Sequence, residues 1–168
     1  MTRIRPAVVE DVPALHRCIV ELAEFERAAH EVTATHEDLR RALFDGADTP
    51  SGHPALHAHV AEVDGEVVAV AIWFLNYSTW TGHHGIYLED LYVMPAFRGR
   101  GIGTGLLAEL AATAVERGYD RFQWWVLDWN ADAIEVYRAL GAVPMDEWTV
   151  HRVTGEALHA LAARAPRA

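Results

Sequence analysis

The fold of this chain is decided by one stretch, Leu88-Glu-Asp-Leu-Tyr-Val-Met-Pro-Ala-Phe-Arg98-Gly-Arg-Gly-Ile-Gly-Thr-Gly-Leu106. It reads as an apolar strand, a glycine-rich turn and the start of a helix. Glycines let a backbone approach a ligand closely, and the N–H groups and dipole of a helix N-terminus attract anions such as phosphate. The stretch is not a Walker phosphate loop, because that motif needs a lysine and this chain has none. The alternative is a turn whose glycines only allow close packing of a helix on a sheet.

Strands and helices alternate on both sides of this stretch. Strands are predicted at Ile4–Val8, 56–60, 67–75, 87–94, 122–127 and, last, Trp148–Val153, and helices at Asp11–Phe25, 35–44, 106–115, 131–140 and 156–163. Asp64-Gly65 predicts a hairpin turn, Asn76–Gly85 a loop, and Asp11 a helix N-cap. The first half is helices and antiparallel hairpins and the second half is β-α-β-α-β, so the fold class is mixed α/β.

Composition limits the kind of protein. A chain of 168 residues with 51% apolar residues can bury one core, and we expect one domain over residues 1–168. Its single cysteine, Cys18, excludes an intramolecular disulfide and fits a reducing compartment. No apolar run reaches a membrane span, and the first residues do not resemble a signal peptide. We therefore expect a cytoplasmic protein.

The net charge is −10, from 24 acidic residues and 14 basic residues that are all arginine. Nucleic acids and anionic membranes are bound through a basic face, so neither is an expected partner. A cationic small molecule would suit the charge. Surface acid that only keeps the protein in solution is an equal alternative on charge alone.

Two motifs resemble those of the GCN5-related N-acetyltransferases. Arg98-x-x-Gly101-x-Gly103 after a strand is similar to the acetyl-CoA pyrophosphate loop of that family, R/Q-x-x-G-x-G/A. A later motif of asparagine, helix and tyrosine has its counterpart in Trp129-Asn130-x-x-Ala133-x-x-x-Tyr137-x-x-x-Gly141-Ala142.

Further segments resemble one branch, the diamine (spermidine/spermine) acetyltransferases and their thialysine-acetylating relatives. They are Ile4-Arg5-Pro6-Ala7, Glu21-Leu-Ala-Glu-Phe25-Glu26, Leu88-Glu89-Asp90 and Trp129-Asn130.

The resemblance implies a central, mostly antiparallel sheet flanked by helices, splayed where two parallel strands part, with acetyl-CoA in the split. It implies cofactor contacts by the backbone of Leu91, Tyr92 and Val93, by the turn, and by the later helix. The expected cofactor-binding residues are Leu91, Tyr92, Val93, Arg98, Gly99, Arg100, Gly101, Ile102, Gly103, Asn130, Ala133 and Tyr137. CoA is strongly anionic and this protein is acidic, so N–H donors close to the cofactor must overcome the repulsion from the protein's net negative charge.

The implied reaction is direct transfer of acetyl from the thioester to an amine. A primary amine has a pKa near ~10.4, so under ~0.1% is uncharged at neutral pH and a proton must be removed. Glu89 is the candidate base. Glu89 and Asp90 point to opposite faces of a strand unless a bulge intervenes. The alternative to a catalytic role is that both are charges on the strand exposed to solvent. Tyr137 is the candidate acid for the leaving thiolate, on the strength of the matched motif. By spacing alone, a tyrosine on one helical face with Ile134 and Leu140 is more often a core residue.

The expected substrate-binding residues are Phe25, Glu26, Glu89 and Trp125. An aromatic ring beside a carboxylate suits a cation, although Phe25 could also be the last core residue of its helix and Glu26 a solvated one. Trp124 and Trp125 are expected to be one core and one cleft residue. His57-x-His59 and His83-His84 lack a third ligand at a metal-binding spacing, so no metal is expected.

The function expected is N-acetylation of a small cationic amine, polyamine-like or thialysine-like. Acetylation of a protein or peptide amine is an alternative, for which Trp80 in the 76–85 loop could provide contacts. A CoA-binding regulatory domain without catalysis is a second alternative, and it would need neither a base nor an acid. The resemblance also implies a homodimer.

Overall fold

The computed structural model describes residues 1–46 and 49–166. The chain divides into two compact units, Met1–Trp125 and Val126–Ala168, which are described separately. The first unit carries the sheet and most of the helices.

Five strands form one sheet in the order β1 (Thr2–Pro6), β2 (Leu56–Val63), β3 (Glu66–Ser78), β4 (His83–Val93) and β5 (Arg121–Trp124). The first four pair antiparallel, and β5 pairs parallel to β4. The prediction of a mixed α/β fold with a mostly antiparallel sheet is confirmed.

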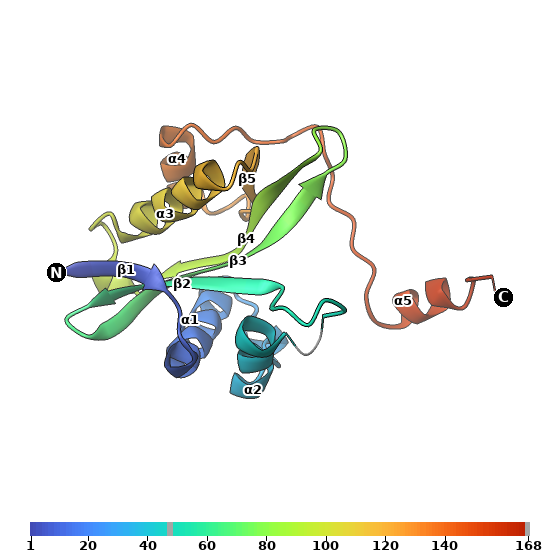
Figure 1. Ribbon diagram of the computed structural model, residues 1–168, viewed down its shortest axis with the longest axis horizontal. Helices are drawn as coiled ribbons and strands as arrows, with labels where there is room; N and C mark the ends of the chain where they lie inside the picture. The colour runs from blue at the N-terminus through green and yellow to red at the C-terminus, as the bar shows by residue number, and fades with distance from the viewer. Residues whose placement is uncertain (47–48, 167–168) are drawn as a thin grey trace. The chain divides into compact units, whose positions relative to one another are not determined.

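Helices cover both faces of the sheet (Figure 1). α1 (Val12–Phe25) and the short α2 (His36–Arg40), extended by a π turn at Arg41–Asp45, lie on one face, and α3 (Ile102–Glu116) lies on the other. The core on the α1 side joins helix residues such as Leu15 and Cys18 to strand residues such as Val60, Val70 and Ile72. Against the other face α3 buries Ile102, Leu106, Leu107, Leu110 and Ala114.

Local signals placed several element ends correctly. Asp64 and Gly65 both have positive φ, 52° and 87°, as a two-residue hairpin turn requires. Thr35 caps α2 through a capping box with Asp38. Asp11 is the N-cap residue of α1, but its carboxylate makes no cap hydrogen bond; it accepts hydrogen bonds from the guanidinium of Arg5, at 2.6 and 3.0 Å, and from the Val8 N–H.

Several expectations about element ends were wrong. β1, expected at Ile4–Val8, lies at Thr2–Pro6. The loop predicted at Asn76–Gly85 is mostly strand, because β3 runs to Ser78 and β4 begins at His83, leaving a short turn. α3 begins at Ile102 instead of Leu106, since Gly101 serves as its N-cap. β5 ends at Trp124, before the predicted end at residue 127.

The second unit contains α4 (Ala131–Ala139), preceded by Asn130 at the N-cap, and α5 (Gly155–Ala162). Both helices were predicted. The strand predicted at Trp148–Val153 is not formed. Trp148 and Val150 alternate with polar residues, but Arg152 ends the alternation, and none of the described segments shares its backbone hydrogen bonds with this stretch.

Candidate active site

The parallel pairing of β4 with β5 covers only part of β4. It runs from Gly85 opposite Arg121 to Leu88 opposite Trp124 and then stops. From Glu89 to Val93, β4 is hydrogen-bonded to β3 on one side, and no described strand pairs with its other edge. This opening is the predicted splay, and its backbone N–H and C=O groups can bind an extended ligand.

A β-bulge lies at the point where the two strands part. Trp73 of β3 is opposite Leu88, whereas the preceding Ile72 is opposite Asp90, so Glu89 is the extra residue on β4. The bulge changes the alternation of side chains. Asp90 therefore lies opposite Ile72, a residue of the core on the α1 side, and Glu89 is exposed.

Asp90 is the most perturbed carboxyl of this region. Burial, together with the negative charges of Glu89 and Glu26, raises its pKa to about 6. Burial also raises the pKa of Glu26. The charges of Glu89 on β4 and of Glu26 after α1 thus both act on Asp90 at the bulge. Such a group of negative charges, partly withdrawn from water, favours a bound cation.

The glycine turn lies directly after β4. Gly99 and Gly101 have φ values of 72° and 75°, and a Cβ atom at either position would meet nothing within 4 Å. Gly101 is the N-cap of the long helix α3, so the first N–H groups of that helix have no partner within the helix. An open turn of this kind fits a phosphate group. Gly105 has a different role, because a Cβ there would lie 2.8 Å from Cδ1 of Ile4, so its absence allows close packing on β1.

The two arginines of the turn fold back on the protein. Nε of Arg98 donates to the Val93 carbonyl at 2.9 Å, and its guanidinium lies over the rings of Phe25 and Tyr92, 5.2 and 5.4 Å from their centroids. Arg100 donates to the Ala96 carbonyl at 3.0 Å and lies over the ring of Phe97.

The remaining predicted cofactor residues of the first unit contribute unequally. Tyr92 and Ile102 have largely buried side chains. Leu91, Val93 and Gly103 are half-buried beside the open edge of β4 and the start of α3.

The predicted substrate residues Phe25 and Trp125 are both exposed, by 38% and 58%. Phe25 is the last residue of α1 and faces Arg98. Trp125 contacts Tyr87 of β4 edge to face, with 5.7 Å between the ring centroids. Trp124 is half-buried and packs on Phe122.

The other predicted residues belong to the second unit. Asn130 is the N-cap of α4, and Ala133 and Tyr137 lie four residues apart on that helix, both half-buried. The asparagine of the later motif is therefore at the start of α4, and its alanine and tyrosine share one face of that helix.

The histidines of β2 have a structural role. His57 and His59 both pack on the ring of Trp73, and the Trp73 indole donates to Nδ1 of buried His59 at 3.1 Å. Burial lowers the pKa of both rings. Among residues 1–46 and 49–166, no three His, Cys, Asp or Glu side chains are grouped as metal ligands. Over the same residues, no helix is long and apolar enough to cross a membrane.

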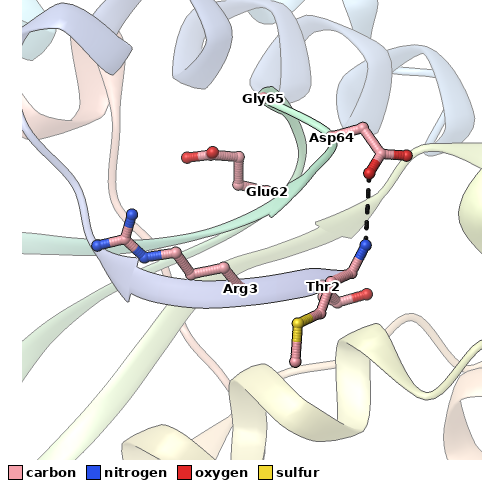
Figure 2. A pocket seen from close by; sticks show the side chains of 6 residues that line it. Thr2, Arg3, Glu62, Asp64 and Gly65 are labelled. Atoms are coloured by element: carbon pink, nitrogen blue, oxygen red, sulfur yellow. Dashed lines mark hydrogen bonds and ion pairs between the residues drawn. The ribbon is translucent and has the colours of Figure 1, made fainter.

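A hollow of about 450 Å³ lies where the start of β1 meets the turn between β2 and β3 (Figure 2). It is lined by Met1, Thr2, Arg3, Glu62, Asp64 and Gly65. The dashed line there marks the ion pair between the Met1 amine and Asp64, at 3.4 Å. Both groups are highly exposed, so this ion pair contributes little to stability. Nothing in this hollow resembles a chemical site.

Two features of the site were missed from the sequence. Asp90 was set aside in favour of Glu89, because alternation along a strand cannot locate a bulge. The contact of Arg98 with Phe25 joins residues far apart in the chain, for which no local pattern exists. The α1 side of this contact did leave a signal, because Glu21, Glu24 and Phe25 recur at helical spacing and share one face at the end of that helix.

Comparison with known proteins agrees with this geometry. The model of the acetyltransferase (GNAT) family matches residues 19–142. The thialysine N-epsilon-acetyltransferase of Mus musculus is 42% identical over 174 residues, covering 97% of this chain and 98% of its own. The L-ornithine N5-acetyltransferase NATA1 of Arabidopsis thaliana is 31% identical and covers 95% of this chain and 87% of its own.

Among solved structures, an integron cassette protein from the mobile metagenome of V. cholerae superposes with a TM-score of 0.77 at 24% identity. That match covers 96% of this chain and 97% of the other, and it supports the fold. The family match and the relatives confirm the expected acetyl-CoA-dependent N-acetyltransferase. The chain therefore belongs to the GNAT acetyltransferase family.

Proposed function

We propose that this enzyme transfers the acetyl group of acetyl-CoA directly to the terminal primary amine of a small aminoalkyl compound. Thialysine-like amino acids and diamines are the candidate substrates. The observation that carries the proposal is the group of three carboxylates, Glu26, Glu89 and Asp90, at the bulge where β4 leaves β5. The names of the relatives, which specify thialysine and ornithine, support an acceptor with an amine at the end of a short chain.

The carboxylates have two tasks in this proposal. Together they attract an ammonium group and hold it at the open edge of β4. One of them, directly or through a water molecule, then accepts the proton that makes the nitrogen nucleophilic. Glu89 remains the predicted base. Asp90 is a second candidate, because a carboxylate with a pKa of about 6 is a stronger base than an ordinary one and is still mostly ionised at pH 7.

The glycine turn and the open edge of β4 are the proposed binding site for acetyl-CoA. Backbone N–H groups of residues 99–103 would bind the pyrophosphate, and the edge from Glu89 to Val93 would bind the pantetheine arm. Acetyl-CoA supplies an activated thioester whose leaving group is a thiolate. Tyr137 is the proposed acid for that thiolate, since a phenol is protonated at neutral pH. Asn130 and Ala133 would bind the cofactor beside it.

The experiment that tests the proposal measures release of CoA thiol from acetyl-CoA by the purified protein. The acceptors are thialysine, lysine, ornithine, putrescine, cadaverine, spermidine and a lysine-containing peptide, and mass spectrometry locates the new acetyl group. We expect acetylation of a terminal amine of a small acceptor. Faster turnover of the peptide would favour protein acetylation instead, and binding of acetyl-CoA without thiol release for any amine would favour a regulatory domain.

Two variants test the acid–base groups. Glu89→Gln and Asp90→Asn each remove a charge without changing shape, and Glu116→Gln, at the exposed end of α3, is the matched control. We expect kcat/KM for the amine to fall in the first two variants, while acetyl-CoA binding is kept. A homodimer also remains a prediction, and a strictly monomeric sedimentation profile at micromolar concentration would contradict it.

A further inference from the structure

A row of four side chains crosses the sheet at the point where β5 leaves β4. Its members are register partners on β2, β3, β4 and β5, namely His57, Trp73, Leu88 and Trp124. We call these four residues the crossing row. They lie on the face that α3 covers, because they alternate along their strands with residues of the core on the α1 side. Beyond this row β5 has ended, and the next residue of β4, Glu89, is the extra residue of the bulge.

Trp73 is the buried aromatic residue at the centre of the crossing row, and β2 holds it in place. Its ring lies against that of His57, with 4.5 Å between the centroids and 30° between the planes. Its indole N–H donates to Nδ1 of His59 at 3.1 Å, diagonally across the β2–β3 pair. Ala71 is the register partner of His59, and its small side chain leaves room there for the indole. Because turning the ring would leave a buried N–H without an acceptor, this hydrogen bond fixes the orientation of Trp73.

The acceptor in this hydrogen bond is a neutral imidazole. Nδ1 accepts a hydrogen bond only when it carries no proton, so the proton of the His59 ring is on Nε2. Burial lowers the pKa of His59 and keeps the ring neutral at pH 7, against the opposite effect of the Glu109 carboxylate on α3. Burial, together with the charge of Arg117, also lowers the pKa of His57. Both rings beside Trp73 are therefore uncharged where the enzyme would work.

We propose that Trp73 is a positioning residue for the carboxylates of the site: it fixes the bulge at Glu89, and its hydrogen bond to His59 holds it there. The proposal rests on the proposed function for the roles of Glu89 and Asp90. A shift of one residue in strand pairing turns side chains to the opposite face of the sheet. With the indole fixed opposite Leu88, the extra residue must fall directly after that pair. Asp90 then lies on the α1 side, where it is buried.

Three variants separate the hydrogen bond from general packing. Trp73→Phe keeps an aromatic ring and removes the indole donor, and His59→Leu removes the acceptor. His59→Asn is the conservative variant, because its amide oxygen can replace Nδ1 as the acceptor. At saturating acetyl-CoA, we expect kcat/KM for the amine to fall at least tenfold in Trp73→Phe and His59→Leu, and less than threefold in His59→Asn.

Two controls accompany these variants. Leu110→Ala truncates a buried side chain of α3 outside the crossing row, so it lowers stability and should change kcat/KM less than threefold. The NMR signal of the Trp73 indole proton, assigned by its loss in Trp73→Phe, reports the hydrogen bond directly. It should shift in His59→Leu and stay near its wild-type position in His59→Asn.

A second measure does not depend on activity. Asp90→Asn should stabilise the wild type more at pH 8 than at pH 4, because burial and the charges of Glu89 and Glu26 disfavour ionised Asp90. If the hydrogen bond fixes the bulge, this increase with pH should be at least halved when Asp90→Asn is made in a His59→Leu protein. In a Leu110→Ala protein it should be unchanged.

A loss of less than threefold in both Trp73→Phe and His59→Leu would overturn the proposal, as would equal losses in His59→Leu and His59→Asn. An effect of Asp90→Asn that is the same in every background would also overturn it. If the wild type acetylates no amine, the proposed function fails, and the comparison of Asp90→Asn between backgrounds alone decides whether Trp73 fixes the bulge. If amines are acetylated and that comparison shows no difference, only the positioning role is refuted.

Discussion

Replacing Asp90 by asparagine should stabilise the protein while reducing its activity. Burial and two neighbouring carboxylates raise the pKa of Asp90 from an ordinary 3.8 to about 6. A group whose pKa is raised by folding favours the folded state when it is protonated, and that contribution is lost as pH rises through the folded pKa. At 1.36 kcal/mol for each pH unit, ionised Asp90 costs up to about 3 kcal/mol of folding free energy at pH 8. No described residue forms a hydrogen bond with the Asp90 side chain, so the amide loses no partner.

The assay is urea unfolding of the wild type and Asp90→Asn between pH 4 and pH 8. The free energies of unfolding should be similar near pH 4, and the variant should become more stable by about 2–3 kcal/mol by pH 8. Taking the difference between the two proteins cancels the titration of all other groups. In a Glu89→Gln background the difference should shrink, because one of the charges that raise the pKa of Asp90 is gone.

A difference that does not change with pH would refute this account of Asp90, and a variant that is less stable at pH 8 would show an unrecognised interaction of the carboxylate. Activity gives a second measure. If Asp90 is the base, kcat/KM for the amine should rise with pH through about 6 in the wild type, and this rise should be absent in the variant.

Three further predictions concern other parts of the molecule. Gly103→Val should fold, because its Cβ would lie at an ordinary 3.5 Å from the Val93 side chain. Its affinity for acetyl-CoA, measured by calorimetry, should fall at least tenfold, which is about 1.4 kcal/mol. An unchanged affinity would contradict the phosphate site. Tyr137→Phe should keep acetyl-CoA binding and lose on the order of 10²–10⁴-fold in kcat, and a loss below about threefold makes Tyr137 a packing residue. Arg5→Leu should lower the free energy of unfolding in urea by about 3 kcal/mol, because buried Asp11 and half-buried Glu62 lose the guanidinium that they share. A decrease below about 1 kcal/mol would contradict this.

What the sequence predicted correctly was local. The Asp64-Gly65 turn, the Thr35 cap and the glycine turn each depend on a few adjacent residues whose backbone preferences determine the conformation. The prediction for Asp11 shows where this stops. Its residue type and its place before a helix indicated a capping carboxylate, but a guanidinium from the neighbouring strand binds that carboxylate instead. A charge-assisted hydrogen bond to Arg5 is stronger than a cap, and it exists only once β1 has folded next to the helix.

The predictions that were wrong concern features that depend on contacts between segments far apart in the chain. The bulge at Glu89 depends on how β3 and β4 pair, so the side on which Asp90 lies cannot be read from β4 alone. The predicted strand at Trp148–Val153 is rich in residues that favour strands, but no described strand pairs with it. The contacts of Arg98 with Phe25 and Tyr92 are set by the packing of α1 against β4, which no short motif encodes.

An acidic protein that uses an anionic cofactor needs separate sites for two signs of charge, and β4 provides them a few residues apart. At the bulge, side-chain carboxylates suit a cation. At the turn, the attraction for an anion comes from backbone N–H groups and the α3 dipole, which cannot be titrated and cannot form ion pairs with nearby glutamates. Arg98 and Arg100 are held by backbone carbonyls and aromatic rings, so they do not neutralise the carboxylates either. Because the anion site is made of fixed dipoles, the cation site can stay acidic at a small distance along the same strand, and the chain can keep a net charge of −10 without losing its cofactor site.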